Sequence, residues 1–281
     1  MIYKLNKIKI TLVLPVYSSD ASFITIINKN CAALVKSMPA VNWTVIIVND
    51  GSPVQVQPDF VRAQLTAPVN YQYIHYPQNK GKGFAVRFGF SRAPSSDIFI
   101  YTDYDFPFGV ESIRETADIL LENKAAIVAG IRGRDYYQSL PVFRQFVTSS
   151  VRLFNKYIFR LQAFDSQAGL KGMNKYALAV LQQTTLNGFL FDLQFIRKAQ
   201  QRQHPICCLP VDCNKQLIFK NFTWALVYKE IKTVTFHLLK KKMPNFCLSP
   251  SGPGIKSQVV TIQQPATLDM VQRAGQMQEA G

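Results

Sequence analysis

Apolar runs alternate with helical patterns along the first 135 residues, and this alternation is the feature that most limits the possible folds. Continuous apolar runs of this kind are typical of strands that are buried on both faces of a parallel sheet. The segments between the runs carry apolar residues at helical spacing, such as Phe23, Ile27, Cys31 and Leu34. The runs cover residues 9–17, 43–52, 71–76, 97–105 and 125–131. The pattern predicts an α/β fold with an open, mostly parallel sheet flanked by helices.

The pattern changes after residue 137, and we divide the chain there. Residues 143–161 mix aromatic and basic side chains in a helical pattern, and a polar loop is expected over residues 162–172. Further helices are expected near residues 174–184 and 187–202, a strand over 205–213, and a basic C-terminal helix over 221–243. The sequence thus predicts one domain over residues 1–248, with halves 1–135 and 136–248. Residues 249–281 are rich in Ser, Pro, Gly and Gln, so we expect a flexible, disordered tail.

Charge and cysteine usage limit the class of protein. Lys and Arg outnumber Asp and Glu by 32 to 17, and a formal charge of +15 suggests an anionic partner such as nucleic acid, a membrane surface or a phosphorylated small molecule. The five cysteines contain no CxxC pair, which favours free thiols in a reducing compartment. No apolar run reaches the length of a bilayer span. We expect a cytoplasmic protein, with contact to the cytoplasmic face of an anionic membrane as a further expectation.

Polar side chains follow several of the predicted strands. In open parallel sheets, ligands bind outside the carboxyl ends of the strands, so these side chains are candidates for one site. Asp103 and Asp105 follow the fourth strand, and side chains two apart on an extended segment point the same way. Two neighbouring carboxylates repel each other unless a cation lies between them, and Mg²⁺ or Mn²⁺ suits that position and also binds phosphate oxygens.

A Gly/Lys loop precedes this pair in the sequence. The stretch "NKGKGFAVRFGF", residues 79–90, places Lys80 and Lys82 beside glycines at a predicted helix N-terminus, with Arg87 and Arg92 close by. Backbone N–H groups at such a position bind anions. The cationic loop would then hold a diphosphate from one side, and the acidic pair with its metal ion would hold it from the other. A solvated helix face is the simpler explanation of the cations.

Five motifs resemble, in order and spacing, glycosyltransferase family 2, and are most similar to its polyprenyl-phosphate branch, the dolichyl-phosphate glucose and mannose synthases. They are "LVLPVY", "VIIVNDGS", "NKGKGFAVRFGF", "IYTDYDFPF" and "DSQAGLKGM", and the resemblance covers roughly residues 8–235. It implies a GT-A fold and inverting chemistry on nucleotide sugars. It also implies that residues 1–135 bind the nucleotide sugar and residues 136–248 the acceptor.

The resemblance implies roles for individual residues. Pro15 and Tyr17 would flank the nucleotide, Asp50 would contact base or ribose, and Lys82 would lie near the base or diphosphate. Asp103 and Asp105 match the metal-binding pair, with Asp105 as the direct ligand of Mg²⁺ or Mn²⁺. Pro107 stands where the mannose synthases have a Gln that assists the metal. Arg132 and Arg144 match the region where that branch binds phosphate, and Arg132, Arg134 and Arg144 are all available to position an acceptor phosphate.

The acceptor decides whether a base is needed. A hydroxyl acceptor requires one, and Asp165 and Asp192 are the candidates, although both would also fit as loop or cap residues. A lipid phosphate is already ionised and needs mainly cationic positioning. The leading hypothesis is a metal-dependent inverting transferase that moves a sugar from a nucleotide sugar, with UDP-sugars favoured, to a polyprenyl phosphate of the cell envelope. Two alternatives stay open: a transferase with a saccharide hydroxyl acceptor, and a non-catalytic basic protein that binds membrane or nucleic acid. No nucleic-acid-reading motif is present, so no nucleic-acid partner is expected.

Overall fold

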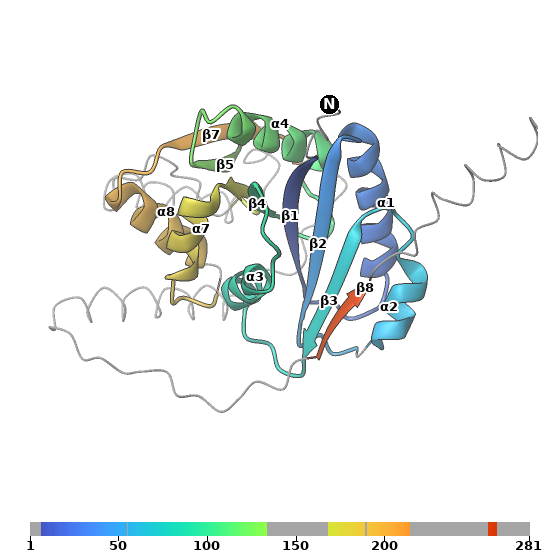
Figure 1. The fold of residues 1–281 in the computed structure, drawn as a ribbon. Coiled ribbons are helices and arrows are strands. Elements are labelled where there is room, and N and C mark those ends of the chain that lie inside the picture. Colours follow the sequence, from blue (N-terminus) through green and yellow to red (C-terminus); the bar gives the residue numbers. More distant parts are fainter. Residues whose placement is uncertain (1–6, 55, 134–167, 189, 214–257, 263–281) are drawn as a thin grey trace, which may run out of the picture.

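One mixed β-sheet forms the centre of the molecule (Figure 1). The computed structural model describes residues 7–54, 56–133, 168–188, 190–213 and 258–262. The strand order in the sheet is β7-β5-β6-β4-β1-β2-β3-β8. The strands are β1 (Ile8–Val16), β2 (Val41–Asp50), β3 (Asn70–Tyr76), β4 (Ile98–Tyr101), β5 (Ile127–Arg132), β6 (Lys171–Met173), β7 (Ile206–Val211) and β8 (Gln258–Ile262).

Most strand pairs are parallel, as the continuous apolar runs predict. β1 pairs in parallel with β2 and β4, β2 with β3, and β5 with β7. β6 is antiparallel to both of its neighbours, β4 and β5, and β8 is antiparallel to β3. The carboxyl ends of β1, β2, β3 and β4 therefore meet at one edge of the sheet. The prediction of an open, mostly parallel sheet is confirmed.

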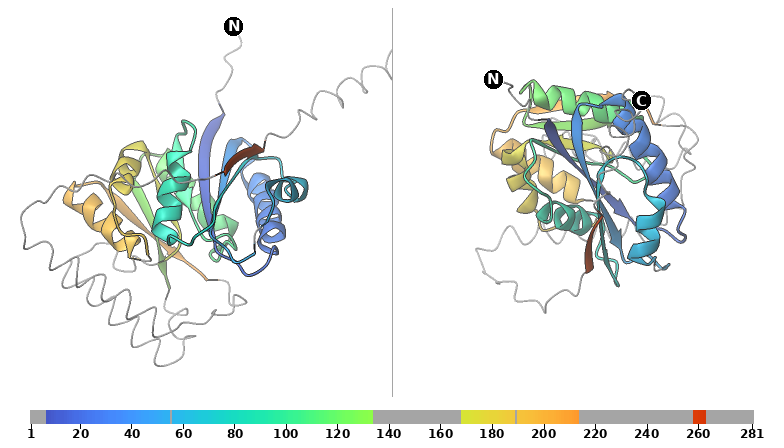
Figure 2. Two further views of the ribbon diagram at one scale, coloured as in Figure 1. Left: turned by 90° about the horizontal axis from the view of Figure 1, so that it is seen from below. Right: turned by 45° about the vertical axis from the view of Figure 1, so that its right-hand side comes forward.

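Helices cover both faces of the sheet (Figures 1 and 2). The described helices are α1 (Phe23–Ser37), α2 (Pro58–Gln64), α3 (Lys82–Ser91), α4 (Gly109–Leu121), α7 (Lys175–Gln182) and α8 (Phe191–Gln201). Helices α1, α2 and α4 contribute to one apolar core, and α3, α7 and α8 contribute to a second core on the opposite face. The result is a three-layer arrangement in which the central strands β1, β2 and β4 bury both of their faces.

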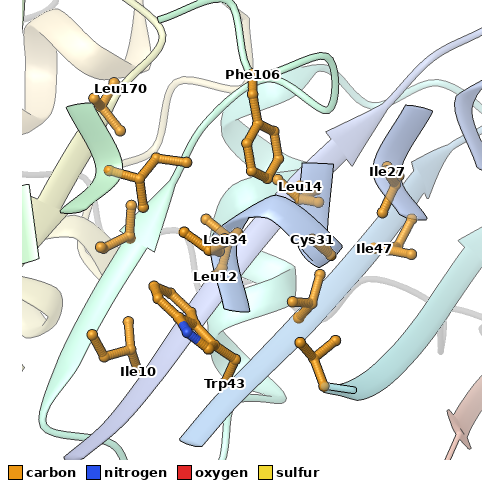
Figure 3. Close-up of a cluster of buried hydrophobic side chains, with 14 of the residues drawn as sticks. Ile10, Leu12, Leu14, Ile27, Cys31, Leu34, Trp43, Ile47, Phe106 and Leu170 are labelled. Carbon is orange, nitrogen blue, oxygen red and sulfur yellow. The ribbon is translucent and has the colours of Figure 1, made fainter. Parts of the chain in front are cut away.

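The core beneath α1 also anchors the chain segment that follows β4 (Figure 3). Phe106 lies in this core with Leu14 and Leu34, and only 4% of its surface is exposed. Its φ of 47° is in the left-handed region, which a bulky residue adopts only when its surroundings hold it there. The packing of Phe106 therefore fixes the segment that carries Asp103 and Asp105.

Two predictions about local structure are wrong. The fourth strand ends at Tyr101 and not at residue 105, because residues 103–106 form a turn in which the N–H of Phe106 donates to the carbonyl oxygen of Asp103 at 3.0 Å. Part of the expected polar loop is strand β6, which is too short, at three residues, to show any periodicity. Within the expected tail over residues 249–281, residues 258–262 form strand β8, which pairs with β3, and the rest of that stretch lies outside the described residues.

No helix in the described part of the chain is both long and apolar enough to cross a bilayer. The long basic helix expected over residues 143–161 and the basic helix expected over residues 221–243 lie outside the described residues.

Candidate active site

The turn after β2 brings together the loops that follow β1, β2 and β3. The side chain of Asn49 accepts a hydrogen bond from the N–H of Ser52 at 3.0 Å, and the hydroxyl of Ser52 accepts one from the N–H of Ser18 at 3.1 Å. Gly51 has a φ of +64°, and a Cβ there would lie 2.4 Å from the backbone nitrogen of Asn79. The "NDGS" motif is therefore a turn that ties the β1 loop in place and admits the backbone of the β3 loop at close range.

Asp50 holds the Gly/Lys loop by its backbone. One carboxylate oxygen accepts from the N–H of Lys80 at 2.7 Å and the other from the N–H of Gly81 at 2.9 Å. Asp50 is buried, and desolvation raises the pKa of its carboxyl, although these two N–H groups act in the opposite direction. The prediction that Asp50 contacts the base or ribose stays a prediction. Both of its oxygens are already engaged in shaping the loop.

The connection between α7 and α8 holds the loop from the other side. The N–H of Gly83 donates to the carbonyl oxygen of Asn187 at 2.7 Å, and a Cβ at Gly81 would lie 2.4 Å from the same oxygen. Arg87 donates to the carbonyl oxygen of Leu186 at 2.7 Å, to the hydroxyl of Thr184 at 3.1 Å and to the side chain of Asn187. Arg87 thus clamps α3 to this connection.

The four cations near the loop have different surroundings. Lys80 lies over the ring of Phe84 at 4.9 Å, and Arg92 lies over the ring of Phe88 at 5.3 Å. Arg87 belongs to the clamp described above. Lys82 alone among the four forms an ion pair in the described part of the chain, with Asp103, at 2.5 Å. From the sequence, these four side chains were predicted to form one cationic cluster. In the structure, Lys82 instead contacts Asp103 of the acidic pair.

Lys82 and Asp103 form the centre of the candidate site. The side chain of Lys82 is 14% exposed and that of Asp103 is 40% exposed. Burial by itself would lower the pKa of Lys82, but the carboxylates of Asp103, Asp192 and Asp105 raise it above its ordinary value, so Lys82 stays protonated. A fixed cation therefore lies beside carboxylates that remain partly open to solvent.

The turn over residues 103–106 presents both carboxylates to this cation. Tyr104 and Phe106 point toward the core, where Tyr104 meets Phe23 edge to face at 6.3 Å. Asp103 and Asp105 alternate with them, and both act electrostatically on Lys82 and on Cys213. The predicted convergence of the two carboxylates is present, but a turn held by core packing produces it, not an extended strand.

The donor set at this turn fits a hard divalent cation. One oxygen of Asp103 is bonded to Lys82, and the other faces Gly169 so closely that a Cβ there would lie 2.3 Å away. No group of three His, Cys, Asp or Glu side chains that could hold a metal occurs within the described ranges. Mg²⁺ and Mn²⁺ are commonly bound by one or two carboxylates, with waters and substrate phosphates as the other ligands. Asp105, with Asp103 beside it, would hold such an ion.

A second set of charged residues is buried beneath this pair, and we call Tyr101, Lys171 and Asp192 the buried triad. Lys171 and Tyr101 are fully buried, and Asp192 is 3% exposed. The ammonium of Lys171 lies 3.5 Å from a carboxylate oxygen of Asp192, and the hydroxyl of Tyr101 donates to that same oxygen. Lys171 and Tyr101 are not among the site residues predicted from the sequence. A lysine set between Leu170 and Met173 in an otherwise apolar stretch was the available signal.

The other predicted site residues are distributed as follows. Pro15 is buried at the end of β1, and Tyr17 is 57% exposed just beyond it. Arg132 ends β5, and its charge acts on the thiol of Cys213, which the acidic pair also reaches. Asp165, Arg134 and Arg144 lie outside the described residues. The structure thus brings Lys82, Asp103, Asp105 and Asp192 together, whereas Arg132 and the acidic pair are linked only by the charge that each exerts on the thiol of Cys213.

A comparison with known protein families agrees with this geometry. The model of Glycosyl transferase family 2 matches residues 11–179, which is more than half of the chain. The chain belongs to glycosyl transferase family 2. A curated relative of this family 2 chain, a dolichyl-phosphate beta-glucosyltransferase of Trichomonas vaginalis, is 23% identical over 226 residues. That alignment covers 76% of this chain and 66% of the relative, and it supports the resemblance to the polyprenyl-phosphate branch.

Solved structures share the fold of this family 2 chain. Mannosyl-3-phosphoglycerate synthase from Rubrobacter xylanophilus superposes with a TM-score of 0.59 at 16% identity, over 90% of this chain and 87% of that chain. Glucosyl-3-phosphoglycerate synthase from Mycobacterium tuberculosis, in complex with Mn²⁺, uridine-diphosphate and glucosyl-3-phosphoglycerate, superposes with a TM-score of 0.56 at 15% identity, over 90% and 86% of the two chains. These likenesses confirm the GT-A fold.

Proposed function

We propose that this family 2 chain is a metal-dependent, inverting glycosyltransferase that moves a hexose from a nucleotide sugar to a polyprenyl phosphate. The observation that carries the proposal is the ion pair between Lys82 and Asp103, which lies beside Asp105 at the carboxyl edge of the sheet. Such a cluster supplies a fixed cation and two metal-binding carboxylates within one site. A nucleoside diphosphate leaving group needs both.

The proposed reaction is a single displacement. An acceptor oxygen attacks the anomeric carbon, a new carbon–oxygen bond forms on one face of the sugar, and the bond to the diphosphate breaks on the other face. The electron pair leaves with the diphosphate oxygen, so charge grows on the leaving group, and Mg²⁺ or Mn²⁺ would neutralise part of it when bound. Lys82 would stabilise the remainder, and Asp105 with Asp103 would hold the ion.

The choice of acceptor rests on two supports. The curated relative is a dolichyl-phosphate beta-glucosyltransferase, and an ionised phosphate acceptor needs no base. The glucose branch also favours a UDP-sugar as donor. Arg132 ends β5 at the same side of the sheet and is the described residue that we assign to the acceptor phosphate, together with Arg134 and Arg144 from the sequence.

We also propose that the chain acts in the cytoplasm at the inner face of an anionic membrane. Its formal charge of +15 supports this, because basic residues near an anionic leaflet each contribute about 1 kcal/mol of attraction. Binding to vesicles of phosphatidylserine and phosphatidylcholine should fall as salt rises. Equal binding to vesicles of phosphatidylcholine alone would contradict the electrostatic attachment.

The test is sugar transfer from a panel of radiolabelled nucleotide sugars to short polyprenyl phosphates, with Mg²⁺ or Mn²⁺. Label should enter the organic phase, and EDTA should abolish it. Asp105→Asn should lower the rate by at least about 100-fold, because the leaving charge loses its metal. Asp118→Asn is the matched control, since Asp118 is an exposed carboxylate on α4.

Other outcomes would redirect the assignment. Metal-dependent release of nucleoside diphosphate with aqueous label only would show a hydroxyl acceptor and contradict the polyprenyl phosphate. No turnover with any donor, together with salt-sensitive binding of nucleic acid, would contradict the enzyme itself.

A further inference from the structure

The buried triad lies directly beneath the candidate diphosphate site, yet no step of the proposed reaction uses it. Asp192 is in the first turn of α8, Lys171 begins β6 and Tyr101 ends β4. The three side chains therefore come from three separate elements on different parts of the chain. Their shared contact is one carboxylate oxygen of Asp192.

The triad is linked to both members of the Lys82–Asp103 pair, through the backbone at Gly169 and through charge. The ammonium of Lys171 donates to the carbonyl oxygen of Ala168, and this bond holds the backbone that leads into Gly169. Gly169 is in turn packed against the free carboxylate oxygen of Asp103, so the bond from Lys171 sets how far Asp103 can move. Asp192 lies close to the other member, because Phe191, its neighbour in α8, packs against Gly83, the neighbour of Lys82, so tightly that a Cβ at Gly83 would lie 2.6 Å from the Cβ of Phe191. At this short range the negative charge of Asp192 acts on Lys82.

Asp192 is poorly placed to act as a base. It is 3% exposed, and one of its two oxygens already takes a hydrogen bond from Tyr101 and the charge of Lys171. A general base must reach the proton that it removes, directly or through one water. A buried carboxylate meets this condition less well than one that is open to solvent.

The energetic cost of the triad points to a functional role. Taking two charges out of water is expensive, and replacing a buried ion pair with apolar side chains is often neutral or stabilising. Lys171 lies in a fully buried strand with Gly172 and Met173, where a methionine of similar length would suffice for packing. Packing therefore does not explain the buried ion pair between Lys171 and Asp192, whereas the placement of a nearby charged group, Lys82, would explain it.

We propose that Asp192, Lys171 and Tyr101 are positioning residues, which hold Lys82 and the backbone at Gly169 against Asp103 so that the site is preorganised for a nucleoside diphosphate. This inference rests on the proposed function, since it names the same diphosphate site. It reassigns Asp192 from candidate base to support of Lys82.

The first test removes a single oxygen atom. Tyr101 is fully buried, so Tyr101→Phe cannot change any direct contact with a ligand. We expect the dissociation constant of UDP with Mn²⁺, measured by calorimetry, to rise about 3–10-fold, the size of one lost hydrogen bond. Tyr71→Phe is the matched control: Tyr71 is also fully buried, in the core beside Cys31, and UDP affinity should stay unchanged.

The second test asks whether Asp192 acts through Lys82. Asp192→Asn should weaken UDP binding in the natural chain but not in a Lys82→Met background, because coupled residues are non-additive. In sugar transfer, Asp192→Asn should raise the donor KM while kcat stays within about tenfold. Loss of a general base would instead lower kcat by about 10²–10⁴-fold.

The outcomes separate the two proposals. If the natural chain binds no nucleoside diphosphate and transfers no sugar, the proposed function fails. Suppose that the natural chain binds UDP but Tyr101→Phe has the same UDP affinity as Tyr71→Phe; the positioning role is then overturned while the proposed function stands. The same conclusion follows if the losses of UDP affinity in Asp192→Asn and Lys82→Met simply add in the double variant. A kcat lost at unchanged KM in Asp192→Asn would restore Asp192 as the base.

Discussion

The two halves of the sheet, one containing β1 and β2 and the other containing β6 and β7, position residues of the candidate site in different ways. β1 and β2 have nine and ten residues, are almost wholly apolar along their buried lengths, and carry site residues only beyond or at their ends. β6 has three residues, and one of them is the buried Lys171. In the first half, the apolar core fixes the strands and the strands then place Asp50, Lys82 and Asp103. In the second half, the charges themselves help to set the backbone. Changes that disturb the apolar core should therefore affect the fold first, and changes beside Lys82 and Asp103 the site.

The largest difference between an effect on activity and an effect on stability is expected for two glycines of the motif "DSQAGLKGM", Gly169 and Gly172. A Cβ at Gly169 would lie 2.3 Å from a carboxylate oxygen of Asp103 and 3.4 Å from the ammonium of Lys82. Gly169→Ala should therefore displace this pair and lower kcat/KM by at least about 100-fold, with little loss of Tm, because a side-chain end can move. The measurements are steady-state sugar transfer and thermal unfolding.

Gly172 provides the matched comparison for this prediction. A Cβ there would lie 2.3 Å from a methyl group of Thr116 and 2.8 Å from one of Leu120, both in the core under α4. Gly172→Ala should cost about 1–3 kcal/mol of unfolding free energy through overpacking. If both substitutions lowered stability and activity in the same proportion, the division between site and core within this motif would be wrong.

An intermediate effect is expected at the clamp between α3 and the α7–α8 connection. Arg87→Met removes three hydrogen bonds, to Leu186, Thr184 and Asn187, and should cost about 1–3 kcal/mol and raise the donor KM. Denaturant unfolding and donor titrations would measure both effects. Arg62→Met, at an exposed position on α2, is the control and should change stability by no more than about 0.5 kcal/mol. A rise in KM without any loss of stability would show that Arg87 contacts the donor directly.

The smallest effect concerns the reactivity of the cysteine thiols, which tests how well each half of the sheet excludes solvent and reagent. Burial raises the pKa of Cys31, in the core of the first half, to about 12. At pH 8 its thiolate fraction is about 1000-fold below that of a thiol at the ordinary value of 9.0. Cys207, on the half-exposed strand β7, should be alkylated by iodoacetamide first, as peptide mapping would show. Equal labelling of Cys31 under native conditions would mean that the first core opens readily.

Much of the first half could be predicted from the sequence because its signals are local. The continuous apolar runs indicate β1, β2, β3 and β5, and helical spacing indicates α1 and α3. Motif order and spacing were enough to locate Asp50, Lys82 and the pair Asp103 and Asp105. The backbone at that pair was predicted wrongly, because the turn depends on Phe106 packing into a core that forms from residues far away in the sequence.

The second half was less predictable, and the reason is physical. A three-residue strand has no periodicity, and β8 depends on an open edge of β3 that only the assembled sheet presents. The sequence likewise cannot show that Arg87 binds the α7–α8 connection, because its partners are distant along the chain. For the same reason it cannot show that Lys171 and Tyr101 both contact one carboxylate oxygen of Asp192. The sequence by itself determined the class of fold, the family motifs and the edge at which the site lies, since apolar patterning and strand direction are local properties. Tertiary structure alone decided which charges face the candidate site and which lie buried below it, because burial and pairing are set by neighbours that are distant along the chain.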